Sequence, residues 1–130
     1  MSPDAKPIRV LLVDDHQLLT GSLSQILDRE PDIEVAGVAA TVEEAKDLSR
    51  ERMDVVLMDY RLPELGGVEA TSAITSRFDT AVVVLTATAE EGELEALMAA
   101  GAVACLTKDS ELEEIVRAIR DASLRGASLV

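Results

Sequence analysis

The sequence predicts an α/β protein with a doubly wound parallel β-sheet and helices on both faces of the sheet. Five short apolar runs alternate with five segments whose apolar residues have the spacing of a helix. Strand–helix units repeated along a chain form parallel sheets with right-handed crossovers. Of the 130 residues, 48% are hydrophobic and only 2% are aromatic. An aliphatic core of this kind suits a sheet that helices cover on both faces.

The predicted strands are runs of four to seven mainly apolar residues. Continuous apolar character indicates that both faces of each strand are covered, as in the parallel sheets of α/β proteins. The runs are Ile8–Val13, Ile33–Ala39, Val55–Met58, Ala81–Leu85 and Val103–Leu106.

Each predicted helix follows one strand and carries an apolar stripe that we expect to pack on the sheet. The first stripe is the most regular, and the second is the weakest. In chain order the stripes are Leu18, Leu19, Leu23, Ile26 and Leu27; Ala45, Leu48 and Met53; Val68, Ala70, Thr71, Ile74 and Phe78; Leu94, Leu97, Met98 and Ala99; and Leu112, Ile115, Val116, Ile119 and Ala122.

Signals at the ends of these segments agree with the helix assignments. The sequence REPD at 29–32 ends the first helix, because proline disfavours helix in the residue before it. Thr41 followed by Glu44 is the pattern of a capping box at the start of the second helix. Gly101 lies where the fourth helix needs a left-handed residue at its end.

The length is that of one domain with its own core. We expect a flexible tail over residues 1–7, the domain over residues 8–124, and the start of a linker over residues 125–130. The last residues, GASLV, suggest a piece of a longer protein in which an output domain follows.

The net charge of −13, from 25 acidic and 12 basic residues, argues against nucleic-acid binding by these residues, because the phosphate backbone would repel them. A cation or a basic partner fits better. No apolar run approaches the roughly 18 residues of a membrane span, and the N-terminus lacks the pattern of a signal peptide. The single cysteine is compatible with a reducing compartment. We therefore expect a soluble, cytoplasmic domain.

Polar side chains stand at the ends of four predicted strands. Asp14 and Asp15 follow the first strand, and Asp59 ends the third. Thr86 closes the fourth strand and Lys108 follows the fifth. Ligands of doubly wound sheets bind beyond the carboxyl ends of the strands. These side chains either end buried strands without further purpose or converge on one crevice.

Three clustered carboxylates would raise one another's pKa values unless a cation lay between them. Mg²⁺ prefers such oxygen ligands and shares phosphate oxygens with its substrate. A carboxylate beside that ion can attack phosphorus and form an acyl phosphate. The lysine and the threonine hydroxyl could then contact the phosphoryl oxygens. This interpretation gives each of the polar side chains a role.

The motifs LLVDDH, DVVLMDYRLPELGGVEA, VVVLTA and GAVACLTKD resemble, in order and spacing, the receiver domains of bacterial two-component response regulators. The likeness extends from residue 8 to about residue 124. The DDHQLL segment and the Lys-Asp pair after the fifth strand look like the nitrate-regulator-like (NarL/FixJ, LuxR-type) subfamily. The resemblance implies a flavodoxin-like (CheY-like) fold with strand order 2-1-3-4-5.

By this resemblance, Asp59 is the phosphoacceptor. Asp15 would bind Mg²⁺ directly and Asp14 largely through water. Asp59 itself and the backbone carbonyl of Arg61 would complete the protein ligands. Because Arg61 stands where haloacid-dehalogenase-type phosphatases need an acid, the alternative of a Mg²⁺-dependent phosphatase or phosphotransferase is weaker.

The resemblance also assigns the residues that respond to the phosphoryl group. Lys108 would pair with it, Thr86 would be the switch hydroxyl, and the small Ala87 would leave it accessible to water. Relatives usually carry an aromatic residue at the position of Cys105. We therefore expect the chemistry to be retained and its transmission to be altered, with Cys105 more simply a small buried residue than a redox site.

Other residues near the motifs have simpler interpretations. Pro63 presets a turn, and Gly66 and Gly67 would permit positive φ before the third helix. His16, without a second histidine or a nearby cysteine, is interpreted as a loop residue at the start of the first helix.

The resulting functional prediction is a signalling switch that receives its phosphoryl group from a sensor histidine kinase. It would control homodimerisation or an attached helix-turn-helix DNA-binding domain, with no enzymatic activity beyond self-phosphorylation from a donor and slow self-dephosphorylation. A phosphorylation-independent interaction domain of the same fold is the remaining alternative.

Overall fold

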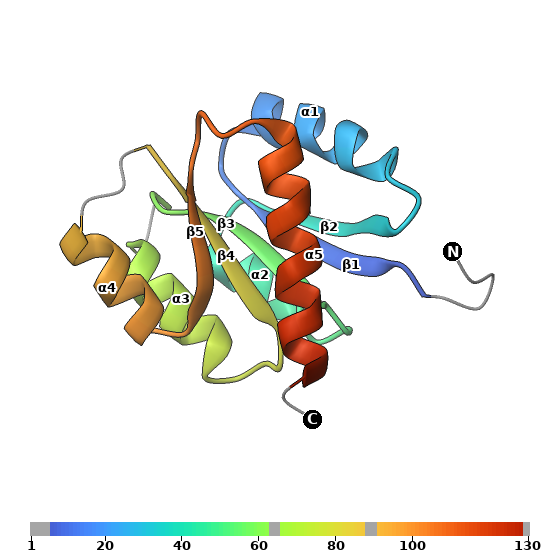
Figure 1. The fold of residues 1–130 in the computed structure, drawn as a ribbon. Helices are drawn as coiled ribbons and strands as arrows, with labels where there is room; N and C mark the ends of the chain where they lie inside the picture. Colours follow the sequence, from blue (N-terminus) through green and yellow to red (C-terminus); the bar gives the residue numbers. More distant parts are fainter. Residues whose placement is uncertain (1–5, 63–65, 88–90, 129–130) are drawn as a thin grey trace.

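A computed structural model describes residues 6–62, 66–87 and 91–128. In these residues five parallel strands form one sheet with the order β2-β1-β3-β4-β5, which confirms the predicted fold (Figure 1). The elements are β1 Ile8–Val13, α1 Gln17–Asp28, β2 Ile33–Ala39, α2 Val42–Leu48, β3 Val55–Asp59, α3 Gly67–Thr75, β4 Ala81–Thr86, α4 Glu91–Ala99, β5 Ala102–Thr107 and α5 Leu112–Ser128.

Helices cover both faces of the sheet. Helices α1 and α5 lie on one face, and α2, α3 and α4 lie on the other (Figure 1). Neighbouring residues of one strand enter different halves of the core, as Leu11 and Leu12 of β1 do. Both are almost completely buried. Burial on both faces explains why β1, β3 and β4 are apolar without alternation.

Each predicted strand is present, and three of them end one residue later than predicted. Strand β3 ends at Asp59, β4 at Thr86 and β5 at Thr107. The strands therefore carry these side chains directly to one edge of the sheet.

The helix ends follow the sequence signals. Helix α1 ends at Asp28. The Glu44 N–H donates to Thr41 Oγ1 at 3.2 Å, and Glu44 Oε2 accepts from the Ala40 N–H at 2.9 Å. The capping box is confirmed in slightly altered form, because the glutamate binds the amide one residue before the cap. Gly101 has φ 114°, as predicted for the end of α4. At the end of the chain α5 continues to Ser128.

The prediction of positive φ at Gly66 and Gly67 is wrong. Within the described residues, Gly101 alone has positive φ, and Gly66 has φ −68°. Glycine is needed for close approach instead: a Cβ on Gly67 would lie 2.6 Å from Tyr60 Cδ2 and 2.9 Å from the Tyr60 carbonyl oxygen. Pro63 falls outside the described residues.

The first apolar stripe was only partly predicted correctly. Leu27 is fully buried, but Leu18 is 91% exposed and Leu19 is 42% exposed. The first turn of α1 therefore presents leucine to solvent at the same end of the molecule as Asp14 and Asp15.

None of the helices in the described ranges combines the length and the apolar character that a membrane span requires.

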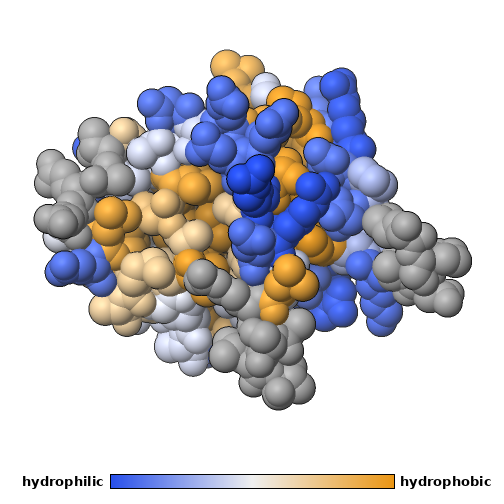
Figure 2. Space-filling model, viewed as in Figure 1, coloured by the Kyte–Doolittle hydropathy of each residue, from blue (hydrophilic) through white to orange (hydrophobic). Residues whose placement is uncertain are grey.

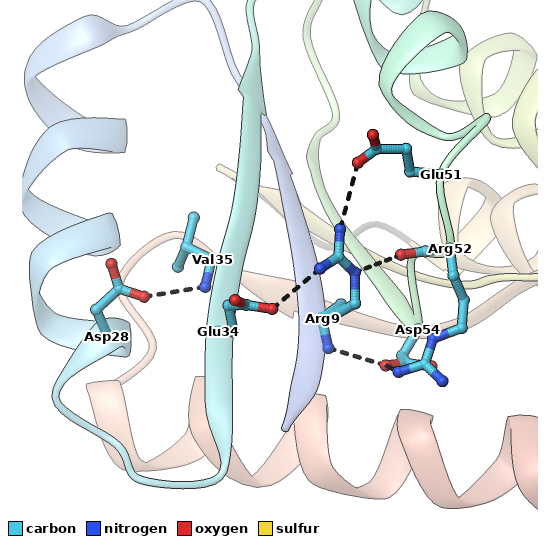
Figure 3. A network of polar contacts seen from close by, with 7 residues as sticks. All are labelled: Arg9, Asp28, Glu34, Val35, Glu51, Arg52 and Asp54. Carbon is cyan, nitrogen blue, oxygen red and sulfur yellow. Dashed lines mark hydrogen bonds and ion pairs between the residues drawn. The ribbon is translucent and has the colours of Figure 1, made fainter. Parts of the chain in front are cut away.

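The outer edge of β2 is covered by carboxylates from the flanking helices. Asp28 Oδ1 accepts a hydrogen bond from the Val35 N–H at 3.0 Å (Figure 3), and Glu44 occupies the Ala40 N–H just beyond the strand. On the side of β1, Glu34 pairs with Arg9 at 3.1 Å. Within this edge strand the Val35 N–H, which no further strand supplies with a partner, is thus bound to a side chain.

Helix α5 is fastened to the loop before β2 by Arg120. Its Nε and one terminal nitrogen donate to the two carboxylate oxygens of Asp32 at 2.7 and 2.9 Å. The hydrogen bonds from Arg120 lower the pKa of Asp32 below its ordinary value of 3.8. A lowered pKa stabilises the folded state above that ordinary value, and the contribution is lost as the pH falls through the pKa of the folded protein.

We therefore expect Asp32→Asn to lower the melting temperature at neutral pH and to reduce the loss of stability on acidification below about pH 4. Melting temperatures measured between pH 7 and pH 3 test this expectation. Asp121→Asn, at an exposed position on α5, is the matched control. If the melting temperatures of Asp32→Asn and of the unmodified protein changed in parallel with pH, the role of the Asp32–Arg120 pair would be contradicted.

Candidate functional site

Asp14, Asp15 and Asp59 come together at the carboxyl edge of the sheet, as the sequence predicts. Strands β1 and β3 are hydrogen-bonded neighbours, with Val13 opposite Met58. Asp14, the residue after β1, therefore lies beside Asp59, the last residue of β3. Their carboxylate oxygens and a ring nitrogen of His16 all lie within 4.8 Å of one another.

We call Asp14, Asp15 and Asp59 the acidic cluster. Its members differ in their access to solvent: Asp59 is 2% exposed and Asp14 is 7% exposed, whereas the Asp15 side chain is 42% exposed. Asp14 is fixed by its own N–H, which donates to the Ala39 carbonyl at 3.0 Å. The cluster thus has a buried centre and one accessible side.

Lys108 is the cation of the site. Its Nζ lies 2.8 Å from Asp59 Oδ1, with the lysine side chain 30% exposed and the aspartate side chain 1% exposed. The backbone places it there, because the Lys108 N–H donates to the Thr86 carbonyl at 2.8 Å. Replacing a partly buried ion pair with apolar residues is often neutral for stability. The pair is therefore weak evidence for a contribution to stability, and its position inside the acidic cluster makes it a candidate for function.

The remaining predicted residues surround this pair. Thr86 is the buried last residue of β4, and Ala87 next to it is exposed. The Arg61 N–H donates to Asp59 Oδ1 at 3.3 Å, so the chain turns back over the carboxylate. The Arg61 carbonyl as a metal ligand stays a prediction. The predicted parallel arrangement of the strands thus placed Asp59, Lys108 and Thr86 at the carboxyl edge of the sheet.

His16 is closer to the site than its interpretation as a loop residue implied. It is the residue that precedes α1, as expected, but its Nδ1 lies 3.3 Å from Asp14 Oδ1 and 3.4 Å from Asp15 Oδ1. The His16 N–H also donates to Asp14 Oδ1 at 2.9 Å. The signal in the sequence is its position directly after the two aspartates.

Cys105 is half-buried and packs against the core on the side of α2, α3 and α4, as does Tyr60. Burial, with the Glu93 carboxylate as a second cause, raises the pKa of the Cys105 thiol. The thiol is therefore protonated at neutral pH and is a poor nucleophile. This environment favours the interpretation of Cys105 as a small packing residue.

The donor set of the acidic cluster fits a hard divalent cation. Two ligand atoms of one Mg²⁺, each about 2.1 Å from it, lie at most about 4.2 Å apart. The observed spread of 4.8 Å therefore requires only a small closure or one ligand bound through water. Carboxylate oxygens suit Mg²⁺ better than the imidazole of His16 does. The cluster accordingly has the chemistry of a magnesium site.

Comparison with known protein families decides the assignment, since residues 10–120 match the response regulator receiver domain. The chain belongs to this family. Receiver domains are the signal-receiving parts of two-component systems, and the five-stranded fold and the acidic cluster agree with that membership.

Individual relatives place this receiver domain in the NarL/FixJ type. It is 43% identical over 115 residues to the response regulator GacA of Pseudomonas aeruginosa, covering 87% of this chain and 54% of GacA. Identity to the transcriptional regulatory protein LiaR of Bacillus subtilis is 40% over 118 residues, covering 89% of this chain and 56% of LiaR. The receiver domain thus spans about half the length of these relatives.

A solved structure gives the same result. The signal receiver domain of the putative response regulator NarL from Mycobacterium tuberculosis superimposes with a TM-score of 0.84 at 31% identity, covering 91% of this chain and 97% of that one. The relatives are named as regulators rather than as enzymes.

Proposed function

We propose that this receiver domain is a phosphorylation-dependent switch in which Asp59 accepts a phosphoryl group. The observation that carries the proposal is the contact of the buried Asp59 carboxylate with Lys108 at 2.8 Å inside the acidic cluster. Asp59 is the member of the cluster that contacts Lys108, and it is the most deeply buried of the three acids. A carboxylate so placed can attack phosphorus and form an acyl phosphate.

Mg²⁺ would be held by Asp14, Asp15 and Asp59, with the Arg61 carbonyl as a further ligand. When bound, the ion neutralises charge on the phosphoryl oxygens. The chain supplies the rest: Lys108 would turn from Asp59 to a phosphoryl oxygen, and Asp59 would present its oxygen for attack.

Thr86 would convey the change to the surface. Its carbonyl accepts a 2.8 Å hydrogen bond from the Lys108 N–H. The two residues proposed to contact the phosphoryl group are therefore linked through the backbone at the ends of β4 and β5. By moving toward the phosphoryl group, the Thr86 hydroxyl would shift the face formed by α4, β5 and α5 between two packings. Ala87 leaves the phosphoryl group open to water and permits slow hydrolysis. Cys105, in place of an aromatic residue, would alter how this movement reaches α4 and α5.

The proposed partners are a sensor histidine kinase as donor and a second copy of the chain. Figure 2 shows apolar residues gathered over β5, whose residues after Ala102 are only half-buried. Met98 of α4 is 47% exposed and Leu124 of α5 is 67% exposed. This face is the proposed dimer surface.

Transcription would be regulated through a helix-turn-helix output domain, because a charge of −13 opposes DNA contact by these residues.

The two alternatives make different demands on the site. A phosphatase of the haloacid-dehalogenase kind needs an acid two residues after the nucleophile, where this chain has Arg61 with its N–H directed at Asp59. A phosphorylation-independent interaction domain would have no use for the pairing of Lys108 with a buried aspartate.

Incubation with Mg²⁺ and acetyl phosphate followed by intact-mass measurement tests the proposal. We expect an adduct of one HPO₃, roughly 80 Da, because phosphorus is transferred to a carboxylate. Chelation of Mg²⁺ with EDTA should suppress it, since the three acids then repel the donor. Absence of any adduct with Mg²⁺ present would favour the interaction domain, and rapid turnover of a phosphomonoester would favour the phosphatase.

A further inference from the structure

A second polar site lies at the opposite end of the sheet from the acidic cluster. The loop segments 49–53 and 77–80, which precede β3 and β4, line a groove of about 390 Å³. Asp59 and Thr86 stand at the other ends of the same two strands. We call the lining segments the arginine groove, because Arg50, Arg52 and Arg77 belong to it. Its size is within the usual range for small-molecule sites.

The charge of this groove departs from that of the chain. Three of the 12 basic residues of a chain with net charge −13 line it, against one glutamate and one aspartate. The glutamate has a partner outside the lining, because Glu51 Oε2 lies 3.5 Å from Arg9, although the glutamate side chain is 80% exposed. The Arg9 Nε also donates to the Arg52 carbonyl at 2.7 Å (Figure 3). Arg9 thus binds the backbone of the loop and offers Glu51 a weak ion pair away from the arginines of the groove.

The arginines of the groove are weakly engaged. Arg50 lies 3.7 Å from Asp47 with both side chains about three-quarters exposed or more, and Arg52 lies 3.4 Å from Asp54. For Arg77 no ion pair is formed among the described residues. Guanidinium groups bind phosphate in a bidentate manner, which a weak surface ion pair does not prevent.

An independent observation also points to a ligand. In the described part of the chain two buried side-chain polar atoms have no hydrogen-bond partner, Ser49 Oγ and Thr80 Oγ1, and both residues line the arginine groove. Ser49 is only 8% exposed. Buried hydroxyls in native proteins are normally satisfied, so each of these oxygens is open to a partner that the described protein groups do not supply. Neither oxygen is exposed to solvent, so each would have to rotate about χ1 to another staggered position to reach a ligand oxygen, and neither has a hydrogen bond to break in doing so.

We propose that the arginine groove binds a small organic phosphate. The phosphoryl group would be held by the Arg77 and Arg52 guanidinium groups and by the Ser49 and Thr80 hydroxyls. The organic part would lie against the half-buried Phe78, which belongs to the same lining. A ligand bound in this way joins the loop before β3 to the loop before β4. The proposal does not depend on phosphorylation of Asp59.

Adenosine monophosphate is the probe, with inorganic phosphate and adenosine as separate arms, all in EDTA so that no Mg²⁺ reaches the acidic cluster. We expect saturable shifts of backbone amide NMR signals in 49–53 and 77–80 and none at Asp59 or Lys108. Adenosine monophosphate should bind more tightly than inorganic phosphate. Shifts from adenosine equal to those from adenosine monophosphate, or no saturable shifts in the groove, would overturn the assignment.

Variants sharpen the test. Arg77→Gln should weaken binding by about tenfold or more, the usual effect of losing a hydrogen bond to a charged group, and Arg29→Gln, at an exposed arginine elsewhere, should not. Asp79→Asn should strengthen binding by removing a like charge from the groove. Equal affinity of Arg77→Gln and the unmodified protein would overturn the proposal.

Ser49→Ala separates a ligand site from a merely hydrated hydroxyl. Without ligand, it should leave stability unchanged or raise it, because it removes an unpaired buried polar atom. With adenosine monophosphate, it should weaken binding. A variant that is less stable without ligand and binds as tightly as the unmodified protein would show that the hydroxyl serves the fold, which overturns its place in the site.

Discussion

Asp59→Asn is expected to abolish the phosphoryl adduct completely. The amide is nearly the same size as the carboxylate but is not a nucleophile, and Asp59 is the acid that contacts Lys108. Intact mass after incubation with Mg²⁺ and acetyl phosphate measures the loss. The fold should persist, because the substitution keeps the volume of a buried side chain, and circular dichroism verifies this.

Asp15→Asn is the matched variant within the same cluster. Asp15 is more exposed than Asp59 and is proposed to bind Mg²⁺, so the variant should form the adduct only at higher Mg²⁺ concentration. Recovery with Mg²⁺ distinguishes a lost ligand from a lost acceptor. An adduct on Asp59→Asn of the same yield as on the unmodified protein would show that another residue accepts the phosphoryl group.

Gly67→Ala should destabilise the domain by about 1–3 kcal/mol, the usual cost of forcing an extra group into a packed site. The added methyl would lie 2.6 Å from Tyr60 Cδ2 and 2.9 Å from the Tyr60 carbonyl oxygen. The ring could turn aside, but the carbonyl can move only with the backbone. Tyr60 follows Asp59 directly, so the displacement should also slow formation of the phosphoryl adduct. Urea unfolding measures the first effect and the time course of the adduct measures the second.

Gly21→Ala provides the opposite control. Gly21 lies on the exposed side of α1, and a Cβ there would meet no atom within 4 Å. Alanine favours helix over glycine by about 0.5–1 kcal/mol, so this variant should be more stable than the unmodified protein and form the adduct normally. If Gly67→Ala and Gly21→Ala changed stability in the same direction, close packing at Tyr60 would not explain Gly67.

The strands could be predicted from the sequence mainly because β1, β3 and β4 are largely buried on both faces and therefore continuously apolar, while β2 and β5 are partly exposed but still rich in apolar residues. Once the strands are known, parallel order places Asp14, Asp59 and Thr86 at one edge without knowledge of any contact. The same argument places Lys108 at this edge, but its direct contact with Asp59 was not predicted. The end of a predicted strand is accurate to within one or two residues, which is enough to place a side chain at this edge of the sheet.

Features that depend on rotation or on contacts between loops could not be predicted in this way. An apolar pattern does not tell which leucine of α1 faces the sheet, so the exposure of Leu18 was missed. A glycine pair does not distinguish positive φ from close approach, as Gly67 demonstrates. The arginine groove unites two loops more than twenty residues apart in the chain, and nothing within either loop indicates the other.

The carboxylates at the margin of β2 have a consequence for self-association. An uncovered parallel strand invites another chain to continue the ladder, a common route to amyloid-like stacking. Here Asp28 already occupies the Val35 amide and Glu44 the Ala40 amide. An incoming backbone would have to displace Asp28 from the strand and approach a chain of net charge −13. Copies of this protein are thereby directed away from edge-to-edge polymerisation at β2 and toward contacts made by side chains.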